Sequence, residues 1–557
     1  MASTATRGGA VWPRLIALAG FVVAIVAGLL LPVYTDEIGW RFQERAAVDH
    51  GVDIAFSDLC GPNSLGHAPW FMMPARWYSA MANQAFADPW FVRVEGVLCA
   101  GLWAMLLWWL IVRLTGTRAQ ARPLHALAFA LLGLGLLPFL LVMSRPEQPV
   151  MLAMTMAIIT AFAPLPRLGE RTAAWVKSVV IVLLVTIAAS YHLKGVLYAP
   201  VALAAIAVGA SGRRTWLPRG VGIGLVVTIT LAAAHYWVDR FRCTAGDPLL
   251  AAHYAHENVA SLLTGSHPAS GLLLQLASGL NPLNYVALAM ADNRPMSHWV
   301  PDGLFPPALL IAVNLLVLIS WIVVVGLALR ALVRFVADTG LRALAQPRVL
   351  IALAIAACVM VWGASQLRRN VYEAAHVLPM LVLFAVLCLT LPRRDPDGTA
   401  AFPRWLAGAA ALFAVISQAA LAFVLLPPLI AAARVPGYLD GQPFSVSVGG
   451  YAQIRRDIAR AMDQAGMPRD RRLNRLLVDD VTYLALQTDT LPLHRLGVLE
   501  VWNGSITDPV DYLRRHNSDG VVVGCRYLPP AMRAGAARAG EICAISRDGL
   551  ARLDDDF

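Results

Sequence analysis

The sequence predicts a polytopic α-helical membrane protein, and three observations lead to that prediction. Of its 557 residues 58% are hydrophobic and only 14% are charged, whereas about 25% of a soluble protein is charged. The mean hydropathy is +0.61. Apolar runs of about twenty residues recur along the chain, and a helix of that length crosses about 30 Å of hydrocarbon with its backbone bonded internally.

The apolar runs predict about 11 transmembrane helices. The first run is longer than the apolar region of a signal peptide and lacks a small-residue cleavage site, so we expect it to be retained. The predicted spans are about 11–33, 91–112, 123–143, 148–164, 174–190, 195–210, 219–236, 306–329, 349–365, 376–391 and 404–427.

Arginine and lysine residues gather at alternate ends of successive spans. Because short cytoplasmic loops collect positive charge, this pattern orients the chain. We expect a bacterial inner (cytoplasmic) membrane protein with a cytoplasmic N-terminus and a periplasmic C-terminal region. The formal charge of +10 largely reflects this topological bias, and we expect no nucleic-acid partner.

The expected orientation separates a transmembrane domain, 1–427, from a C-terminal periplasmic α/β domain, 428–557, which mixes helical patterns with short β-branched runs. Long outer loops are expected at about 34–90 and 237–305. The first contains Trp70, Trp77, Tyr78 and Trp90, which predict an interfacial helix. The second predicts further juxtamembrane helices.

Four cysteines fall in the outer segments, where disulfides persist. Cys525 and Cys543 are the candidates for a local bridge, and Cys60–Cys243 is a weaker pairing between two loops. The remaining cysteines lie in apolar runs, where packing is the default interpretation: Cys99, Cys358 and Cys388. No cysteine or histidine spacing typical of a zinc site occurs.

Three short outer turns carry cations on the membrane face that normally disfavours them. The turns read SRPEQP at 144–149, YHLKG at 191–195 and QLRRNVYEAAHVLP at 366–379. A single such cation is explained by a side chain that reaches the lipid headgroups, but recurrence at one rim predicts a substrate site. Arg and Lys donate to phosphate oxygens, so the expected ligand is a lipid-linked phosphate or diphosphate. The predicted site residues are Arg145, Glu147, His192, Lys194, Arg368, Arg369, Tyr372 and His376.

Two adjacent acids, Asp36 and Glu37, follow the first apolar run in the stretch YTDEIGWR. A solvated helix end would explain them by themselves. On the same face as the basic turns, a carboxylate is placed to take a proton from an acceptor hydroxyl while cations hold a departing phosphate. We predict Asp36 as the general base. For Glu37 three roles stay open: orienting the acceptor, binding a divalent cation, or facing solvent. The sequence establishes no cofactor requirement and leaves a divalent cation open.

The chain resembles the polytopic GT-C glycosyltransferases, especially the branch that includes the aminoarabinose transferase of lipid A and the protein O-mannosyltransferases. The resemblance lies in TDE after the first span, the long first outer loop, the turns SRPE and YHLKG, the stretch RRNVYEAAHVLP, and the outer tail. It implies a sugar donor carried on polyprenyl phosphate, attack by an acceptor hydroxyl, and inversion at the anomeric carbon. Asp36 matches the first-loop catalytic acid of the family, and Arg145, Glu147, Lys194 and Arg368 match residues that line the donor.

The function expected from these observations is transfer of a sugar, a hexose or a pentose, to a cell-envelope acceptor, as in polysaccharide biosynthesis. The tail matches neither named subfamily, so the acceptor stays open between a glycan, a lipid and a protein. A transporter or flippase of lipid-linked sugars would show repeated halves or broken midplane helices, and we find no internal repeat. A ligase or polymerase of surface glycans outside the GT-C family would place its chemistry in one large outer loop, whereas the charges here lie in several short turns.

Overall fold

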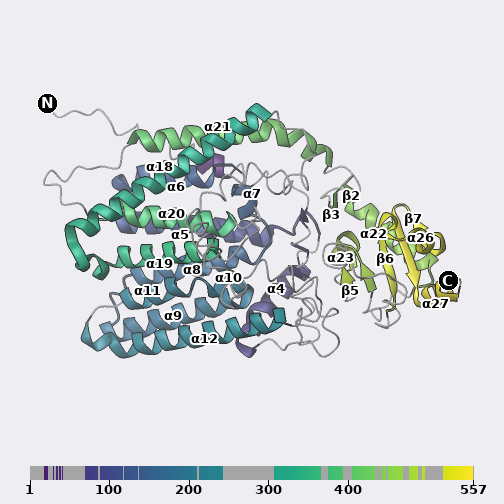
Figure 1. Ribbon diagram of the computed structural model, residues 1–557, viewed down its shortest axis with the longest axis horizontal. Helices are drawn as coiled ribbons and strands as arrows, with labels where there is room; N and C mark the ends of the chain where they lie inside the picture. The colour runs from purple at the N-terminus through teal and green to yellow at the C-terminus, as the bar shows by residue number, and fades with distance from the viewer. Residues whose placement is uncertain are drawn as a thin grey trace, which may run out of the picture.

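The computed structural model describes two regions, a helical bundle and a smaller C-terminal unit (Figure 1). The described residues are 69–242 except 86–87, 117, 136 and 210–211; 307–364; 374–392; 404–432; parts of 15–41; and, in the tail, 438–439, 442–446, 450–467, 476–486, 492–495, 513 and 518–555.

The bundle consists of long apolar helices and several shorter ones. Among the described residues, four helical stretches have the length and hydropathy to cross a membrane: Val94–Thr115, Glu170–Tyr191, Arg213–Trp237 and Leu315–Ala345. The protein is therefore a multi-pass membrane protein. The helices are α4 (Met73–Ala85), α5 (Val94–Thr115), α6 (Arg118–Leu132), α7 (Leu137–Leu141), α8 (Glu147–Phe162), α9 (Glu170–Tyr191), α10 (Leu193–Val196), α11 (Ala199–Val208), α12 (Trp216–Arg242), α18 (Pro307–Thr339), α19 (Pro347–Ala364), α20 (Ala374–Leu389) and α21 (Arg404–Ala432).

These helices follow the predicted apolar runs, with two differences. The run 123–143 is not one helix, because a turn that contains Gly133 and Gly135 separates α6 from α7, and Gly135 has a φ of +60°, a conformation that glycine adopts without steric cost. The run 195–210 is likewise divided between α10 and α11. Most of the first predicted span, and the loop 237–305 beyond Arg242, lie outside the described residues.

Two glycines let backbone segments approach closely at the end of the bundle where α8 begins. A Cβ at Gly96 in α5 would collide with the carbonyl oxygens of Val142 and Met143, just before the turn at 144–146. A Cβ at Gly195 in α10 would collide with the carbonyl oxygen of Ala188 in α9. Two of the three predicted basic turns are therefore held against a neighbouring helix at positions that only glycine fits.

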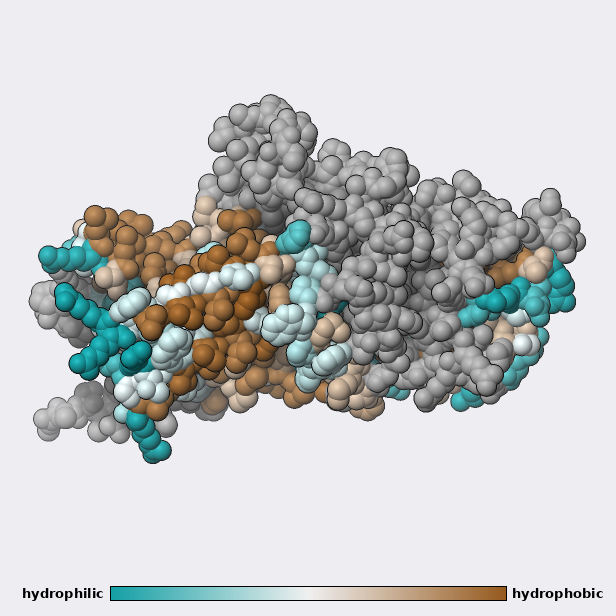
Figure 2. Space-filling model, turned by 90° about the horizontal axis from the view of Figure 1, so that it is seen from below, coloured by the Kyte–Doolittle hydropathy of each residue, from teal (hydrophilic) through white to brown (hydrophobic). Residues whose placement is uncertain are grey.

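The outer surface of the bundle is apolar. Figure 2 shows a broad hydrophobic surface that ends in hydrophilic residues at one end of the molecule. Exposed residues of this kind include Leu98, Met105, Leu183, Leu231 and Ile319. A hydrophobic band of this kind is expected where helices face lipid.

The helix α4 carries the aromatic residues that predicted an interfacial element. Trp77 and Tyr78 on α4 are exposed, as are the flanking Trp70 and Trp90. Exposed tryptophan and tyrosine beside an apolar bundle are typical of the boundary between lipid and water.

The tail begins with a small sheet that includes the end of the first predicted span. Strand β3 (Gln442–Val446) pairs with β2 (Tyr438–Leu439) and with β1 (Val33–Tyr34), both antiparallel, and Val33 is opposite Val446. The residues directly before the Asp36 and Glu37 pair are thus tied by backbone pairing to the tail.

The rest of the tail is a mixed five-stranded sheet covered on both faces. Its strand order is β5-β4-β6-β8-β7, with β4 parallel to β5 and β6, and the β6, β8 and β7 ladder antiparallel. Helices α22 and α23 pack on one face, and α26 and α27 on the other. The elements are β4 (Leu476–Val478), β5 (Pro492–Arg495), β6 (Gly520–Gly524), β7 (Ala537–Ala539), β8 (Ile542–Ser546), α22 (Tyr451–Gln464), α23 (Asp480–Leu486), α26 (Pro530–Gly535) and α27 (Arg547–Asp555).

The tail contains the predicted local disulfide and a buried helix cap. Cys525 and Cys543 form the disulfide, whereas Cys60 and Cys243 lie outside the described residues. Asp479 caps α23, since its Oδ1 accepts from the backbone N–H of Thr482 at 2.8 Å and its Oδ2 from that of Gly524 at 2.7 Å. The capping carboxylate thereby connects the ends of β4 and β6.

Candidate functional site

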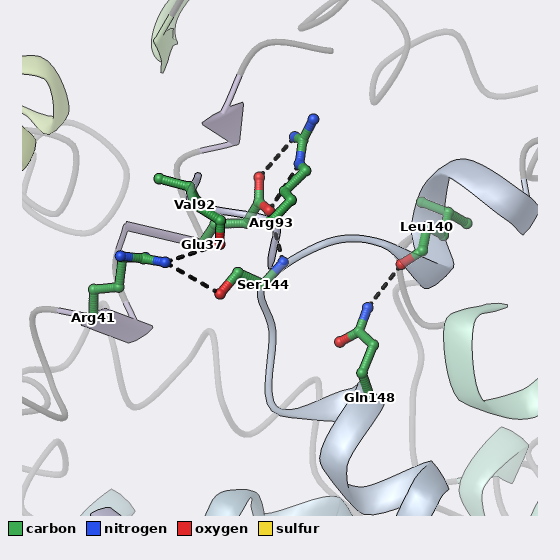
Figure 3. A network of polar contacts seen from close by, with 7 residues as sticks. All are labelled: Glu37, Arg41, Val92, Arg93, Leu140, Ser144 and Gln148. Carbon is green, nitrogen blue, oxygen red and sulfur yellow. Dashed lines mark hydrogen bonds and ion pairs between the residues drawn. The ribbon is translucent and has the colours of Figure 1, made fainter. Parts of the chain in front are cut away.

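Glu37 lies at the centre of a buried polar network at one end of the bundle (Figure 3). Arg93, directly before α5, donates from Nε to Glu37 Oε1 at 3.0 Å and from Nη2 to Oε2 at 2.8 Å. The backbone N–H of Ser144 also donates to Oε1, at 2.8 Å. Burial excludes the solvent-facing role for Glu37, and its carboxylate instead joins three segments that are distant in sequence.

Arg41, one helical turn after Glu37, extends this network. Its guanidinium donates to the carbonyl oxygens of Asn83 at 3.1 Å and Val92 at 2.9 Å, and lies 3.5 Å from Ser144 Oγ. Burial lowers the pKa of the Arg41 guanidinium, and the Glu37 carboxylate, which raises it, is the largest opposing influence. Arg41 therefore connects the loop after the first span to α4, to the turn before α5 and to the turn before α8.

Arg145 and Glu147, from the predicted turn after the third span, form a buried ion pair. Arg145 donates from Nε and Nη2 to the two oxygens of Glu147 at 3.0 and 2.9 Å. Glu147 is the first residue of α8, where a negative charge interacts favourably with the helix dipole. Burial opposes ionisation, but Arg145 first, then His192 and Lys194, hold the pKa of the Glu147 carboxyl below its ordinary value. Two of the predicted basic turns thus meet at one carboxylate.

His192 and Lys194, from the second predicted turn, lie against aromatic rings. His192 caps α10 by accepting from the Lys194 N–H at its Nδ1, 3.0 Å away. Its ring lies 5.2 Å from that of Trp40 and 6.5 Å from that of Trp237. The Lys194 ammonium lies 5.5 Å from the centre of the Trp362 ring, within cation–π range.

The tail packs against the loop that carries Glu37. Val33, Ile38 and Val92 share a buried cluster with residues of α22 and α23. Tyr483 of α23 and Tyr451 of α22 are close enough to Arg41 to influence the pKa of its guanidinium. The C-terminal unit therefore helps to fix the network around Glu37.

A pocket opens beside these groups. It is lined by Trp40, Arg41, Ser79, Asn83, Glu95, Ser144, Arg145, Pro146, Pro149 and Tyr191, and encloses about 300 Å³ of space, its open mouth included. Two guanidinium groups, one carboxylate, small polar side chains and two aromatic rings thus border one space. A concave site with a few converging polar groups is typical of ligand binding.

The structure places five of the ten predicted site residues. Glu37, Arg145, Glu147, His192 and Lys194 lie at the same end of the bundle, and Arg145 borders the pocket. His376 lies in the first turn of α20, with only its backbone described. The others lie outside the described residues: Asp36, Arg368, Arg369 and Tyr372.

Several residues of the site were not predicted from the sequence. The signal that could have found them is the one used for the predicted residues, a charged residue at the end of an apolar run on the same side of the membrane. It applies to Arg41, Arg93 and Glu95. Within the described part of the chain, no three histidine, cysteine, aspartate or glutamate residues gather as metal ligands would.

No protein-family model matches the chain, and no curated protein matches it in sequence. Solved structures do. ArnT from Cupriavidus metallidurans, bound to undecaprenyl phosphate, matches with a TM-score of 0.48 and 14% identity over 97% of this chain and 98% of that one. The archaeal oligosaccharyltransferase AglB from Archaeoglobus fulgidus, in complex with an inhibitory peptide and a dolichol-phosphate, matches with a TM-score of 0.40 and 12% identity over 92% of this chain and 69% of that one.

A third match is the arabinosyltransferase EmbB from Mycobacterium smegmatis, with a TM-score of 0.30 and 13% identity over 77% of this chain and 42% of that one. All three matches are at most 14% identical to this chain, and their TM-scores lie between 0.30 and 0.48. At these identities and TM-scores the likeness does not extend to individual residues, so the assignment of roles rests on the geometry of the site.

Proposed function

We propose that the protein is an inverting glycosyltransferase that moves a sugar from a polyprenyl-phosphate donor to a hydroxyl of a cell-envelope acceptor on the periplasmic side. The observation that carries this proposal is the convergence of two short basic turns, through Arg145, His192 and Lys194, at the end of the bundle where Glu37 is bonded to the Ser144 N–H. A lipid phosphate that enters from the bilayer would meet these cations at the membrane rim. The undecaprenyl phosphate bound to ArnT is a ligand of this class.

In the proposed reaction the acceptor hydroxyl attacks the anomeric carbon of the donor sugar. A bond forms between the acceptor oxygen and that carbon, and the bond from the carbon to the phosphate oxygen breaks. Asp36 takes the proton of the acceptor hydroxyl, and Arg145 and Lys194 stabilise the charge on the departing polyprenyl phosphate. Attack opposite to the leaving group inverts the anomeric centre.

The network around Glu37 supports a division of labour between the two adjacent acids. Glu37 is bonded by Arg93 and by the Ser144 N–H, so it serves to position the loop. This leaves Asp36, its neighbour in sequence, as the proposed base.

The experiment that tests the proposal is a transfer assay with purified protein. The donors are radiolabelled polyprenyl-phosphate sugars, the acceptors are envelope glycans, lipids and proteins, and each reaction is run with and without a chelator. We expect label transfer by the wild type, and loss of transfer but retained donor binding in Asp36→Asn. Turnover retained by Asp36→Asn would remove the base assignment, and donor binding without transfer to any acceptor would favour a carrier.

The phosphate-binding role is tested with Lys194→Ala. This variant removes the ammonium that lies over the Trp362 ring and leaves the bonded pair of Arg145 and Glu147 in place. We therefore expect it to fold and to bind the donor more weakly. Affinity for the lipid-linked sugar equal to that of the wild type would contradict the proposed role of Lys194.

A further inference from the structure

Three glutamates of the described chain lie around the site, and they differ in what holds them. Glu37 is bonded by Arg93, and Glu147 by Arg145, both with two hydrogen bonds from one guanidinium. Glu95 lies in the first turn of α5 and borders the pocket. Among the described residues, no hydrogen bond or ion pair to the Glu95 carboxylate is found, and Arg41 is the cation close enough to interact with it electrostatically. Of these three described glutamates, Glu95 is the one placed to contact a ligand.

Besides Arg41 and Arg145, the pocket that Glu95 borders is lined by small, neutral polar side chains. Ser79 and Asn83 lie one turn apart on α4, both are buried, and the Asn83 amide lies 3.5 Å from the Ser79 hydroxyl. A hydroxyl, an amide and a carboxylate together offer donors and acceptors at a few fixed positions. Trp40 and Tyr191 add aromatic rings to the same lining.

This lining suits a sugar better than a phosphate. A sugar hydroxyl donates to a carboxylate in a charge-assisted hydrogen bond and accepts from an amide or a serine hydroxyl. A phosphate would be repelled by Glu95, because like charges at close range disfavour each other. The cations of Arg145 and Lys194 are therefore the favoured place for the phosphate, and the Glu95 side of the pocket is left for the group that the phosphate carries.

We propose that Glu95, together with Ser79 and Asn83, forms a subsite that binds hydroxyl groups of the sugar carried by the donor lipid. This inference rests on the proposed function, since it assigns the sugar-recognising part of the same site. Glu95 then contributes to which sugars are accepted, and the basic residues contribute to binding of any polyprenyl phosphate.

The experiment compares binding of lipids with and without a sugar. The probes are undecaprenyl phosphate and undecaprenyl-phosphoryl glucose, mannose and arabinose, measured against purified full-length protein in detergent. For the wild type we expect at least one sugar to increase affinity over undecaprenyl phosphate alone. Glu95→Gln removes the charge and keeps the shape, so we expect affinity for that sugar-bearing lipid to fall by about 10- to 100-fold, with affinity for undecaprenyl phosphate unchanged.

Three further variants make the result specific. Ser79→Ala should lower the same affinity in the same direction by a smaller factor. Lys194→Ala should weaken all four lipids alike, because it acts on the phosphate. Glu170→Gln is the matched control, since Glu170 also lies in the first turn of a long helix, α9, but at the opposite end of the bundle, and it should change no affinity.

Each remaining outcome counts against the subsite. An equal loss for lipids with and without the sugar in Glu95→Gln, or no loss for either, would overturn it. So would a wild type whose affinity rises with none of the three sugars. Failure of the proposed function has a different signature, because a protein that binds sugar-bearing lipids through Glu95 but transfers no sugar would retain the subsite and lose the transferase assignment.

Discussion

Among the described residues, buried ion pairs distinguish the two ends of the helical bundle, although Arg41 at the first end also bonds to backbone carbonyls. At the end where α8 begins, which we call the site end, arginines bond to carboxylates: Arg93 to Glu37 and Arg145 to Glu147, all of them buried. At the other end, which we call the far end, basic residues bond to backbone carbonyls at the carboxyl ends of neighbouring helices.

Lys177 and Arg348 illustrate the far end. The Lys177 ammonium lies 2.9 Å from the carbonyl oxygen of Ala161 and 2.8 Å from that of Gly209, at the ends of α8 and α11. Arg348 donates to Leu114 O at 3.0 Å, at the end of α5, and to Thr390 O after α20. These cations satisfy carbonyls that a helix end leaves without an intrahelical partner, and they complement the helix dipole.

The difference teaches how to separate topological charge from functional charge. A cation that caps a helix end needs only one residue in a loop, as the bias of cytoplasmic loops provides. A buried ion pair needs two charges held together at a desolvation cost, either from separate segments, as in Arg93 and Glu37, or within one turn, as in Arg145 and Glu147. Paired buried charge at one end of the bundle is therefore the better indicator of a site.

The largest effect is expected when a site-end pair is broken. Glu37→Ala leaves Arg93 buried without its carboxylate and the Ser144 N–H without its acceptor, so we expect the free energy of unfolding to fall by about 3–5 kcal/mol. Thermal unfolding of the purified protein in detergent measures the change. The paired replacement Glu37→Leu with Arg93→Met should recover most of the loss, and a single variant as stable as the wild type would show that the pair does not hold the loop.

A smaller effect is expected at the far end. Lys177→Met keeps the aliphatic chain and removes the ammonium that bonds to Ala161 O and Gly209 O. Because Lys177 is only half-buried and water replaces part of the interaction, we expect a loss of about 1–2 kcal/mol. A loss as large as that of Glu37→Ala, measured in the same unfolding assay, would erase the distinction between the two ends.

The smallest effect is expected in the pH dependence of stability at the site end, and it sharpens the comparison between the two ends. The pKa of Glu147 is lower in the folded protein than its ordinary value of 4.5, so its ion pair stabilises the fold fully above that ordinary value and loses this contribution as pH falls through the folded value. The stability difference between wild type and Glu147→Gln should therefore be constant from about pH 7 to pH 5 and shrink in stronger acid. The corresponding difference for Lys177→Met should not change in that range. A Glu147→Gln difference that already shrinks above pH 5 would contradict the lowered pKa.

Much of the fold could be predicted from the sequence, because each relevant signal is local. Apolar length predicted the runs that became α5, α8, α9 and α12. The outer location of Cys525 and Cys543 made them candidates for the disulfide that the structure contains. The break between α6 and α7 was missed, since isolated glycines in an apolar run are also tolerated within membrane helices.

The site could be predicted only in part, for a related reason. Arg145, Glu147 and Lys194 stood out because they occur in very short turns between apolar runs, where charged side chains are uncommon unless they serve a site. Arg93 and Glu95 were not predicted because they lie at the start of a span, where a charge is ordinary. Arg93 belongs to the site because it bonds to Glu37, and Glu95 because it borders the pocket. Such partners depend on packing between distant segments, which a single sequence does not display.

The pairing of Val33 with Val446 has a consequence for the order of biosynthesis. The loop that holds Glu37 leaves the ribosome early, but its strand partner is made only after every helix of the bundle. Since chains fold progressively as they are synthesised, we expect the pocket to stay incomplete while the nascent protein is inserted into the bilayer. Under the proposed function, a partly translated chain that lacks the tail would be unable to transfer the sugar from its lipid-linked donor.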